Sequence, residues 1–451
     1  MAVVMDTMTV VIDLNPMAAV QLEVKIGALI NACFLKFHQD PFVADCVAGL
    51  VTALAKIPQM LPCLEQRLLT TIVSIINQHD KPELVGILNH ALELVEIFVK
   101  SVEPPLSEAL INDAFPAVLR MMMVTEDTEA LQYGSCCLRA YVRKSPAQIQ
   151  AWNDGTRTGH QYIVQVIERL LLPEMADSAC LDVGRLIVQL LLKTTMSQEL
   201  SQSMFLAVTR KLFALKPLLT IVQSLIFVIA YWINMAPIAA LQFLKENGFT
   251  EKFFKIWLET HEFFWGKYAR NVSVQALIKA FMSRNNDLAS IMVQGDEKPS
   301  TGRGIKTRSK AKKAPIQYTQ ISVYAKIAKI IIHEHGTVLE DERQQALDEK
   351  HADDDSDGEW EDDEDDEVNA FASKSPFAPA ELFSSDLIDL GGGGFFDDDE
   401  VEDEEEKEDP LYNINMKDIT TTFLKSLSAD QEVAAHVLPA LTKLEQETAA
   451  R

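Results

Sequence analysis

Residues 81–100 read KPELVGILNHALELVEIFVK, and this stretch decides the fold class. Its apolar side chains recur every three or four positions, at Leu84, Ile87, Leu88, Leu92, Leu94, Val95 and Phe98. That spacing places them on one face of a helix, and Pro82 suits the first turn of such a helix. The stretch therefore predicts an amphipathic helix that packs against other elements through one face.

The same periodicity covers most of the chain up to about residue 286. It predicts further helices near 22–37, 41–57, 60–77, 106–124, 128–143, 161–172, 178–193, 197–215, 217–234, 251–260 and 268–283. Strands would alternate apolar and polar residues, and we find no such run. Gly and Pro number 18 each among 451 residues, which is too few for a fold built from many tight turns. We expect an all-α chain.

The spacing of these helices indicates a repeat. The better-buried helix of each pair begins near residues 41, 82, 127, 178, 217 and 265, at intervals of 39 to 51 residues. HEAT and armadillo units recur at about 40 to 47 residues, and residues 181–185 (LDVGR) have the acid–apolar–x–basic order of a HEAT second helix. A compact bundle is the alternative, which the lack of a long closing loop before residue 295 disfavours. We predict a HEAT-repeat α-solenoid.

The chain divides into five predicted regions. These are HEAT repeats over 1–294, a basic inter-helix loop over 295–315, a helix of the last repeats over 316–340, a disordered acidic loop over 341–410, and closing helices within 411–451, at 417–427 and 430–446. A solenoid tolerates such a long insertion because distant packing is undisturbed. Residues 1–14 are apolar on too many sides for a terminal cap. We therefore expect the chain to begin part-way through a longer solenoid.

Negative charge is concentrated in residues 341–410, which hold 30 acidic and four basic residues. A solubilising spacer is the simplest interpretation of such a segment. The rings of Trp360, Phe395 and Phe396 instead favour a ligand for a basic protein such as a histone, with rings as anchors and carboxylates around them. The candidate basic-cargo residues are Asp353, Asp354, Asp355, Asp357, Glu359, Trp360, Glu361, Asp362, Asp363, Glu364, Asp365, Asp366, Phe395, Phe396, Asp397, Asp398 and Asp399.

A basic run precedes the acidic segment and contains no acidic residue. Its members are Arg303, Lys306, Arg308, Lys310, Lys312 and Lys313. The run could contact nucleic acid or act as a nuclear localisation signal. It could also pair with the acidic segment as an internal clasp that cargo must open, because one helix separates the two charge blocks. These three interpretations stay open.

Signatures of enzymes, metals and membranes are absent from the sequence. We find no nucleophile elbow, phosphate-binding loop or dinucleotide fingerprint, and the acidic clusters lack EF-hand spacing. His333 and His335 are two residues apart, so on a helix they point to different faces and make a poor metal pair. The six cysteines lie in apolar helical patterns and read as reduced core thiols of a cytosolic or nuclear protein. Residues 218–233 are too short a run to span a bilayer. We expect no catalysis, no cofactor and no metal.

The order of several motifs resembles the C-terminal end of importin-β-family karyopherins. These motifs are GIKTRSK at 304–310, one helix, EWED at 359–362 in an acidic loop, and DPLYNI at 409–414. Upstream, residues 268–271 (YARN) and 27–37 fit the same superhelix, so the resemblance covers essentially the whole chain. It implies a C-terminal half without the N-terminal repeats that carry the family's main Ran-binding surface.

The resemblance also implies a function and a set of partners. Such receptors are HEAT solenoids that carry cargo through nuclear pores by contacting phenylalanine-glycine repeats, and Ran-GTP controls cargo release. The implied cargoes are histone dimers, chiefly, with ribosomal proteins and actin. We expect shuttling between cytoplasm and nucleus, and neither a membrane nor a direct nucleic-acid partner. A histone chaperone or HEAT scaffold without transport activity is the alternative function.

Overall fold

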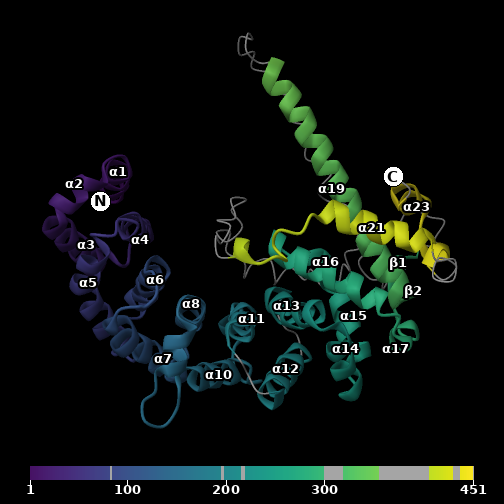
Figure 1. Ribbon diagram of the computed structural model, residues 1–451, viewed down its shortest axis with the longest axis horizontal. Helices are drawn as coiled ribbons and strands as arrows, with labels where there is room; N and C mark the ends of the chain where they lie inside the picture. The colour runs from purple at the N-terminus through teal and green to yellow at the C-terminus, as the bar shows by residue number, and fades with distance from the viewer. Residues whose placement is uncertain are drawn as a thin grey trace, which may run out of the picture. The chain divides into compact units, whose positions relative to one another are not determined.

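The computed structural model describes residues 1–81, 84–194, 198–214, 219–298, 318–354, 406–429 and 437–449. The chain forms two compact units, Met1–Val228 and Ile229–Arg451. Both units are built mainly from α-helices (Figure 1), which confirms the predicted fold class.

The first unit is a series of helices joined by short connections. Its elements are α1 (Ala2–Leu14), α2 (Pro16–Gln21), α3 (Glu23–Phe37), α4 (Pro41–Ala55), α5 (Leu61–Ile76), α6 (Val85–Ser101), the π-helix η2 (Leu110–Ala114), α7 (Phe115–Val124), α8 (Thr128–Lys144), α9 (Pro146–Ala151), α10 (Gly159–Leu170), the 3-10 helix η3 (Asp177–Cys180), α11 (Val183–Lys193), α12 (Gln198–Leu212) and the first part of α13 (Leu219–Met235). The predicted helices fall within a few residues of these bounds, except that α1, α2 and α9 were not predicted as helices.

These helices pack in two rows. One row runs α4, α6, α8, α11, and the other runs α3, α5, α7, α10, with each helix against the next of its own row and against its partner across the rows (Figure 1). Hydrogen bonds repeat between residues 40 to 46 positions apart. They join Asn89 to Glu129, Leu106 to Gln148, Gln132 to Ser178 and Gly184 to Ser224. A helix-pair repeat of this period is the HEAT solenoid that the sequence predicts.

Burial explains why the repeat is stable. In α6 the predicted apolar stripe is inside, with Leu92, Val95 and Phe98 fully buried between the two rows. Asp127 begins α8 by accepting hydrogen bonds from the backbone N–H groups of Glu129 and Ala130, at 3.0 and 3.1 Å. That cap satisfies N–H groups that a helix start otherwise leaves unpaired.

The closest approach in the first unit occurs at Gly184. A Cβ atom there would lie 2.0 Å from the backbone oxygen of Ser224, whereas one at Gly49 on the exposed face of α4 would meet nothing within 4 Å. We expect Gly184→Ala to lower the free energy of unfolding by about 3 kcal/mol through steric overlap. Gly49→Ala, the matched control, should raise it by up to about 1 kcal/mol through helix propensity. Urea unfolding measures both, and equal effects would contradict this packing.

The second unit surrounds one long helix. Its elements are the rest of α13, α14 (Pro237–Glu246), α15 (Thr250–Thr260), the 3-10 helix η4 (His261–Phe263), α16 (Lys267–Met282), α17 (Asn286–Ala289), β1 (Met292–Glu297), β2 (Tyr318–Ser322), α19 (Val323–Asp354), the 3-10 helix η6 (Glu406–Glu408), α21 (Met416–Ala429), the 3-10 helix η7 (Leu438–Ala440) and α23 (Lys443–Ala449). α19 contacts α16, α17, α21, α23 and both strands, so it organises this unit.

Two features of the second unit differ from the sequence prediction. We expected no strands, but β1 and β2 pair as an antiparallel hairpin in which Val293 faces Ile321. Each strand is short and β1 has a single fully buried apolar side chain, Val293, so its alternation is too weak to recognise. Residues 318–322, predicted as the start of a helix, therefore form a strand, and the helix begins at Val323.

The predicted helix bounds near the C-terminus also differ from those in the structure. α19 continues to Asp354, so residues 341–354, which we assigned to the acidic loop, are helical. The predicted closing helix at 417–427 corresponds to α21, whereas the predicted helix at 430–446 is interrupted: η7 ends at Ala440 and α23 begins at Lys443. Pro439 lies in η7. Because proline is well accommodated only in the first turn of a helix, it disfavours a helix that continues through this position.

Candidate functional site

The acidic segment was predicted to bind basic cargo, whereas the role of the basic run stayed open, and most residues of both lie outside the described structure. Asp353 and Asp354 fall in the last turn of α19. The remaining candidates of the acidic segment, from Asp355 to Asp399, and all six of the basic run, from Arg303 to Lys313, lie outside the described residues. What the structure describes are the elements from which both segments leave the second unit.

The acidic segment leaves the second unit through the C-terminal half of α19. Residues 340–347 are exposed, and this half of the helix projects away from the neighbouring helices of the unit (Figure 1). The helix is held on the rest of the unit by contacts with α21, where His335 Nδ1 lies 3.0 Å from Thr420 Oγ1 and Lys417 Nζ lies 2.5 Å from Glu342 Oε2. The acidic segment thus starts on a helix that is packed on the rest of its unit.

The other end of the acidic segment is anchored by Asp409. Its Oδ2 accepts hydrogen bonds from the hydroxyls of Tyr231 on α13 and Tyr268 on α16, at 2.6 and 2.9 Å, and its Oδ1 accepts one from Leu411 N at 2.7 Å. Burial, reinforced by the neighbouring Asp409 carboxylate, raises the pKa of both tyrosines. They therefore remain protonated donors at neutral pH.

The residues after Asp409 extend this anchor. Asn271 Nδ2 donates to the backbone oxygen of Tyr412 at 2.8 Å, and Lys267 Nζ lies 4.7 Å from the centre of the Tyr412 ring. Tyr412 is buried. The DPLY sequence that closes the acidic segment is therefore a docking sequence for α13 and α16. In the sequence this motif stands out only by resemblance, since nothing local indicates two tyrosines 141 and 178 positions away.

Removal of the Asp409 carboxylate should loosen this anchor. We expect Asp409→Ala to lower the free energy of unfolding of the second unit by about 2–4 kcal/mol, because it removes the carboxylate that accepts from both tyrosine hydroxyls. Asp341→Ala, on the exposed part of α19, is the matched control and should change it by less than about 0.5 kcal/mol. Urea unfolding followed by near-UV circular dichroism measures both, and similar small changes would show that Asp409 is no anchor.

The basic run leaves the unit through the β1–β2 hairpin. Met292 pairs with Ser322 and Glu297 with Tyr318, with an irregularity between Gln294 and Glu297. A Cβ at Gly295 would lie 2.4 Å from Thr319 Oγ1, so this position needs glycine for the strands to approach. The hairpin brings the two ends of the basic segment together, a pairing that was not predicted from the sequence.

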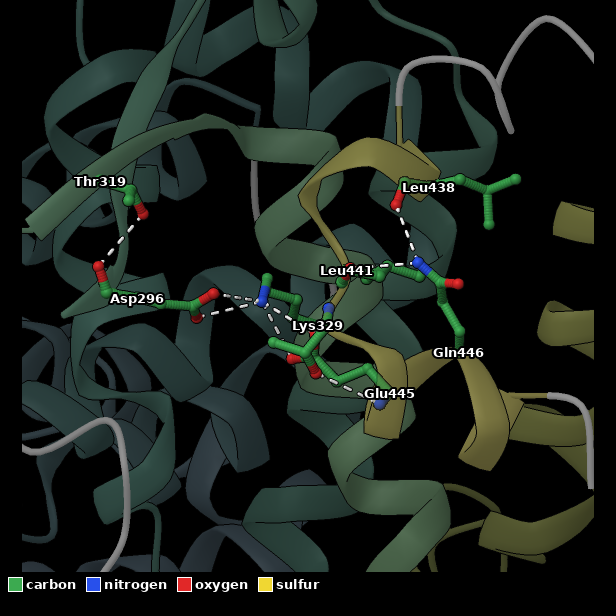
Figure 2. Close-up of polar contacts among 8 residues, drawn as sticks. Asp296, Thr319, Lys329, Leu438, Leu441, Glu445 and Gln446 are labelled. Atoms are coloured by element: carbon green, nitrogen blue, oxygen red, sulfur yellow. Dashed lines mark hydrogen bonds and ion pairs between the residues drawn. The ribbon is translucent and has the colours of Figure 1, made fainter. Parts of the chain in front are cut away.

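A buried lysine connects the hairpin to the C-terminal helix. Lys329 Nζ on α19 donates to both carboxylate oxygens of Asp296 on β1, at 3.0 and 2.8 Å, and to both of Glu445 on α23, at 3.0 and 2.9 Å (Figure 2). Only 1% of its side chain is exposed. A buried ammonium needs such compensation. The burial of Lys329 could not be recognised from the sequence, because a lysine in a helical pattern is normally assigned to the surface.

A metal site or a membrane-spanning helix would indicate another kind of function. Within the described ranges, no set of three or more His, Cys, Asp or Glu side chains is arranged to hold a metal ion. His333 is exposed while His335 is buried against α21, so the two rings lie in different surroundings. None of the described helices combines the length and apolar composition needed to cross a bilayer. The cysteines in these ranges are free thiols.

Comparison with known proteins identifies relatives over most of the chain. No family model matches it. It is 28% identical to importin-9 of Drosophila melanogaster over 86% of this chain and 38% of that protein. It is 25% identical to importin subunit beta-5 of Schizosaccharomyces pombe over 71% of this chain and 32% of that protein, and 30% identical to importin subunit beta-5 of Saccharomyces cerevisiae over 38% of this chain and 18% of that protein.

The chain therefore spans well under half the length of the relatives it matches. The similarity extends across the solenoid rather than being confined to one charged segment, since it covers 408 residues in the first of them. Together with the two-row helical repeat, it makes the chain similar to importin-β-family proteins in both sequence and helical architecture.

Proposed function

We propose that this chain acts in nuclear import, as part of a receptor that binds basic cargo through its acidic segment and carries it into the nucleus. Histone dimers are the chief cargo and ribosomal proteins a further one. GTP-bound Ran controls release, and contacts with phenylalanine-glycine repeats take the complex through the pore between cytoplasm and nucleus. The names of the relatives and the order of the sequence motifs support this function.

The anchoring of the acidic segment at both ends is the observation that carries the cargo proposal. A solubilising spacer needs no fixed exit and no fixed return. Here the segment leaves on α19, which is packed on α21, and returns at Asp409, which is bonded to α13 and α16. The segment between these fixed ends contains 21 acidic residues between 355 and 405. A locally raised concentration of carboxylates favours a basic protein over a neutral one.

A direct binding experiment tests this function. The full chain is titrated with refolded histone dimers labelled with a fluorophore, and with a neutral globular protein as control. We expect nanomolar to micromolar affinity for the histones, weakened by salt, and no binding of the neutral protein. Equal binding of the two proteins would contradict the proposed cargo class.

Binding to phenylalanine-glycine repeats separates transport from the alternative function, a histone chaperone or scaffold. A receptor that passes the pore must bind such repeats weakly, whereas a chaperone has no need to. We expect the immobilised repeats to retain the chain, and repeats with serine in place of phenylalanine to release it. Histone binding without any retention would favour the chaperone.

A further inference from the structure

A cavity of about 330 Å³ lies in the second unit, outside both charged segments. Its walls come from the end of α15, η4, the start of α16, the β1–β2 hairpin and the middle of α19. Gln294, Gly295 and Tyr318 place it beside the part of the hairpin nearest the basic run. Its size is sufficient for one long side chain, at the lower end of the range for ligand pockets.

Carboxylates and cations line this cavity in equal numbers. Glu259, Glu262 and Glu334 line it, together with Lys326, Lys329 and Arg270. Lys329 is already bonded to two carboxylates from outside the lining, those of Asp296 and Glu445. Arg270 Nη2 donates to Glu334 at 2.6 Å. The lining and the two further carboxylates bonded to it therefore carry a net negative charge.

Glu259 is a part-buried carboxyl group in this lining. Burial raises the pKa of its carboxyl group, and the nearby charges of Lys326 and Lys255 lower it only in part. The carboxylate would thus gain from a further cation in the cavity.

His261 supplies a second, independent indication. Its side chain is 3% exposed and lines the cavity, and its Nε2 has no hydrogen-bond partner among the described residues. Its ring stacks on Phe264, with centroids 5.3 Å apart. Burial lowers the pKa of His261 to about 4, so the ring is neutral at pH 7 and one nitrogen is an acceptor.

The position of the proton decides which nitrogen accepts. His261 Nδ1 lies 3.9 Å from Glu334 Oε1, so the proton is favoured on Nδ1 and Nε2 is left as the acceptor. An unfilled buried acceptor calls for a donor. Lysine and arginine side chains have donors and no acceptor.

Aromatic rings also line the cavity and can bind a cationic side chain. Phe264, Trp265 and Tyr318 line the cavity, and Trp265 is 48% exposed. The face of an aromatic ring attracts an ammonium or guanidinium group, and the aliphatic stem of the same side chain packs on it. Carboxylates, an unfilled acceptor and rings in one cavity are what a long cationic side chain requires.

We propose that this cavity binds a lysine or arginine side chain of a basic partner peptide. The proposal rests on the proposed function, in that it gives basic cargo a second point of contact besides the acidic segment. It differs from the acidic segment in kind, because the cavity holds one side chain in a fixed geometry whereas the segment supplies many carboxylates. Occupation by the chain's own basic run is the competing outcome.

Fluorine NMR distinguishes the two contacts in the intact chain. The chain has five tryptophans, among which Trp265 reports on the cavity and Trp360 on the acidic segment. The protein is labelled with fluorotryptophan, the two resonances are assigned with Trp265→Phe and Trp360→Phe, and octalysine is added, with octaglutamate as the control peptide. We expect octalysine to move both resonances and octaglutamate to move neither.

The matched variants carry the same change of charge. Glu259→Gln with Glu262→Gln alters the cavity, whereas Glu246→Gln with Glu251→Gln alters exposed positions on α14 and α15. In the first pair we expect the midpoint of the Trp265 shift to rise about tenfold in peptide concentration, as the loss of a charge-assisted contact would give, while the Trp360 shift is retained. The second pair should behave as the unchanged protein.

The other outcomes distinguish a failure of the cavity proposal from a failure of the proposed function. A Trp360 shift with an unmoved Trp265 resonance refutes the cavity while leaving the cargo function intact. If neither resonance moves and histones do not bind either, the proposed function fails with it. If replacing Lys310 and Lys312 by Ala moves Trp265 without any peptide, the chain's own basic run is the occupant and the proposal is wrong.

Discussion

Histone-dimer binding should weaken about a hundredfold at low salt when residues 355–405 are replaced by a short Gly/Ser linker. The replaced segment contains 21 acidic residues and one basic residue. Single exposed ion pairs contribute about 0.2–1 kcal/mol each, so a handful made together gives the roughly 2.7 kcal/mol that a hundredfold change in affinity represents. Fluorescence anisotropy with labelled histone dimers measures the change.

The limits of this replacement follow from the structure. It begins after Asp354, the last residue of α19, and ends before Glu406, so Asp409 and its two tyrosine donors are retained. A second variant keeps the length and the rings of Trp360, Phe395 and Phe396 but changes each Asp and Glu of 355–405 to its amide. We expect it to bind about as weakly as the linker variant. Unchanged affinity in the amide variant would refute an electrostatic role.

Loss of the Lys329 ammonium should destabilise the second unit by about 3 kcal/mol. Lys329→Met preserves the length of a buried side chain but removes the ammonium that bonds the carboxylates of both Asp296 and Glu445. Removing one partner of a buried pair costs about 3–5 kcal/mol, and we take the lower end because 37% of the Asp296 side chain is exposed. Urea unfolding of the full chain measures this effect.

The effect of Lys329→Met should be greatest at α23. This helix has no buried residue of its own, and Glu445 also accepts a hydrogen bond from Thr442 N at 2.6 Å. Hydrogen exchange should therefore accelerate in 437–449 more than in α15. Lys255→Met, on α15 with 41% of its side chain exposed and an ion pair to Glu251, is the control and should change stability by less than about 0.5 kcal/mol. Equal effects of the two substitutions would contradict a central role for Lys329.

The helical repeat could be predicted from the sequence because its information is local and repeated. The apolar stripe of residues 84–98 becomes the buried face of α6, and the predicted spacing reappears as hydrogen bonds between residues 40 to 46 positions apart. Each repeat shows the same period independently. An error in one predicted helix boundary therefore does not change the predicted fold.

The strands and the anchors could not be predicted, because they depend on residues far apart in the sequence and occur only once. β1 has one fully buried apolar residue, and its partner strand does not begin until Tyr318, so neither shows a pattern by itself. Asp409 sits in a segment crowded with other acids, and only the distant Tyr231 and Tyr268 distinguish it. His261 likewise became a candidate only once η4, α16 and α19 were seen to surround one cavity.

The dependence of histone affinity on salt tests the central claim most directly, namely that the acidic segment holds basic cargo by charge. The affinity of the intact chain and of the 355–405 linker variant is measured from about 50 to 300 mM salt, a range over which such charge pairing weakens strongly. Release of counterions makes the logarithm of affinity fall linearly with the logarithm of salt concentration, in proportion to the number of charges paired. We predict a steep slope for the intact chain and one shallower by several charges for the variant. Identical slopes would show that the acidic segment does not contact the cargo.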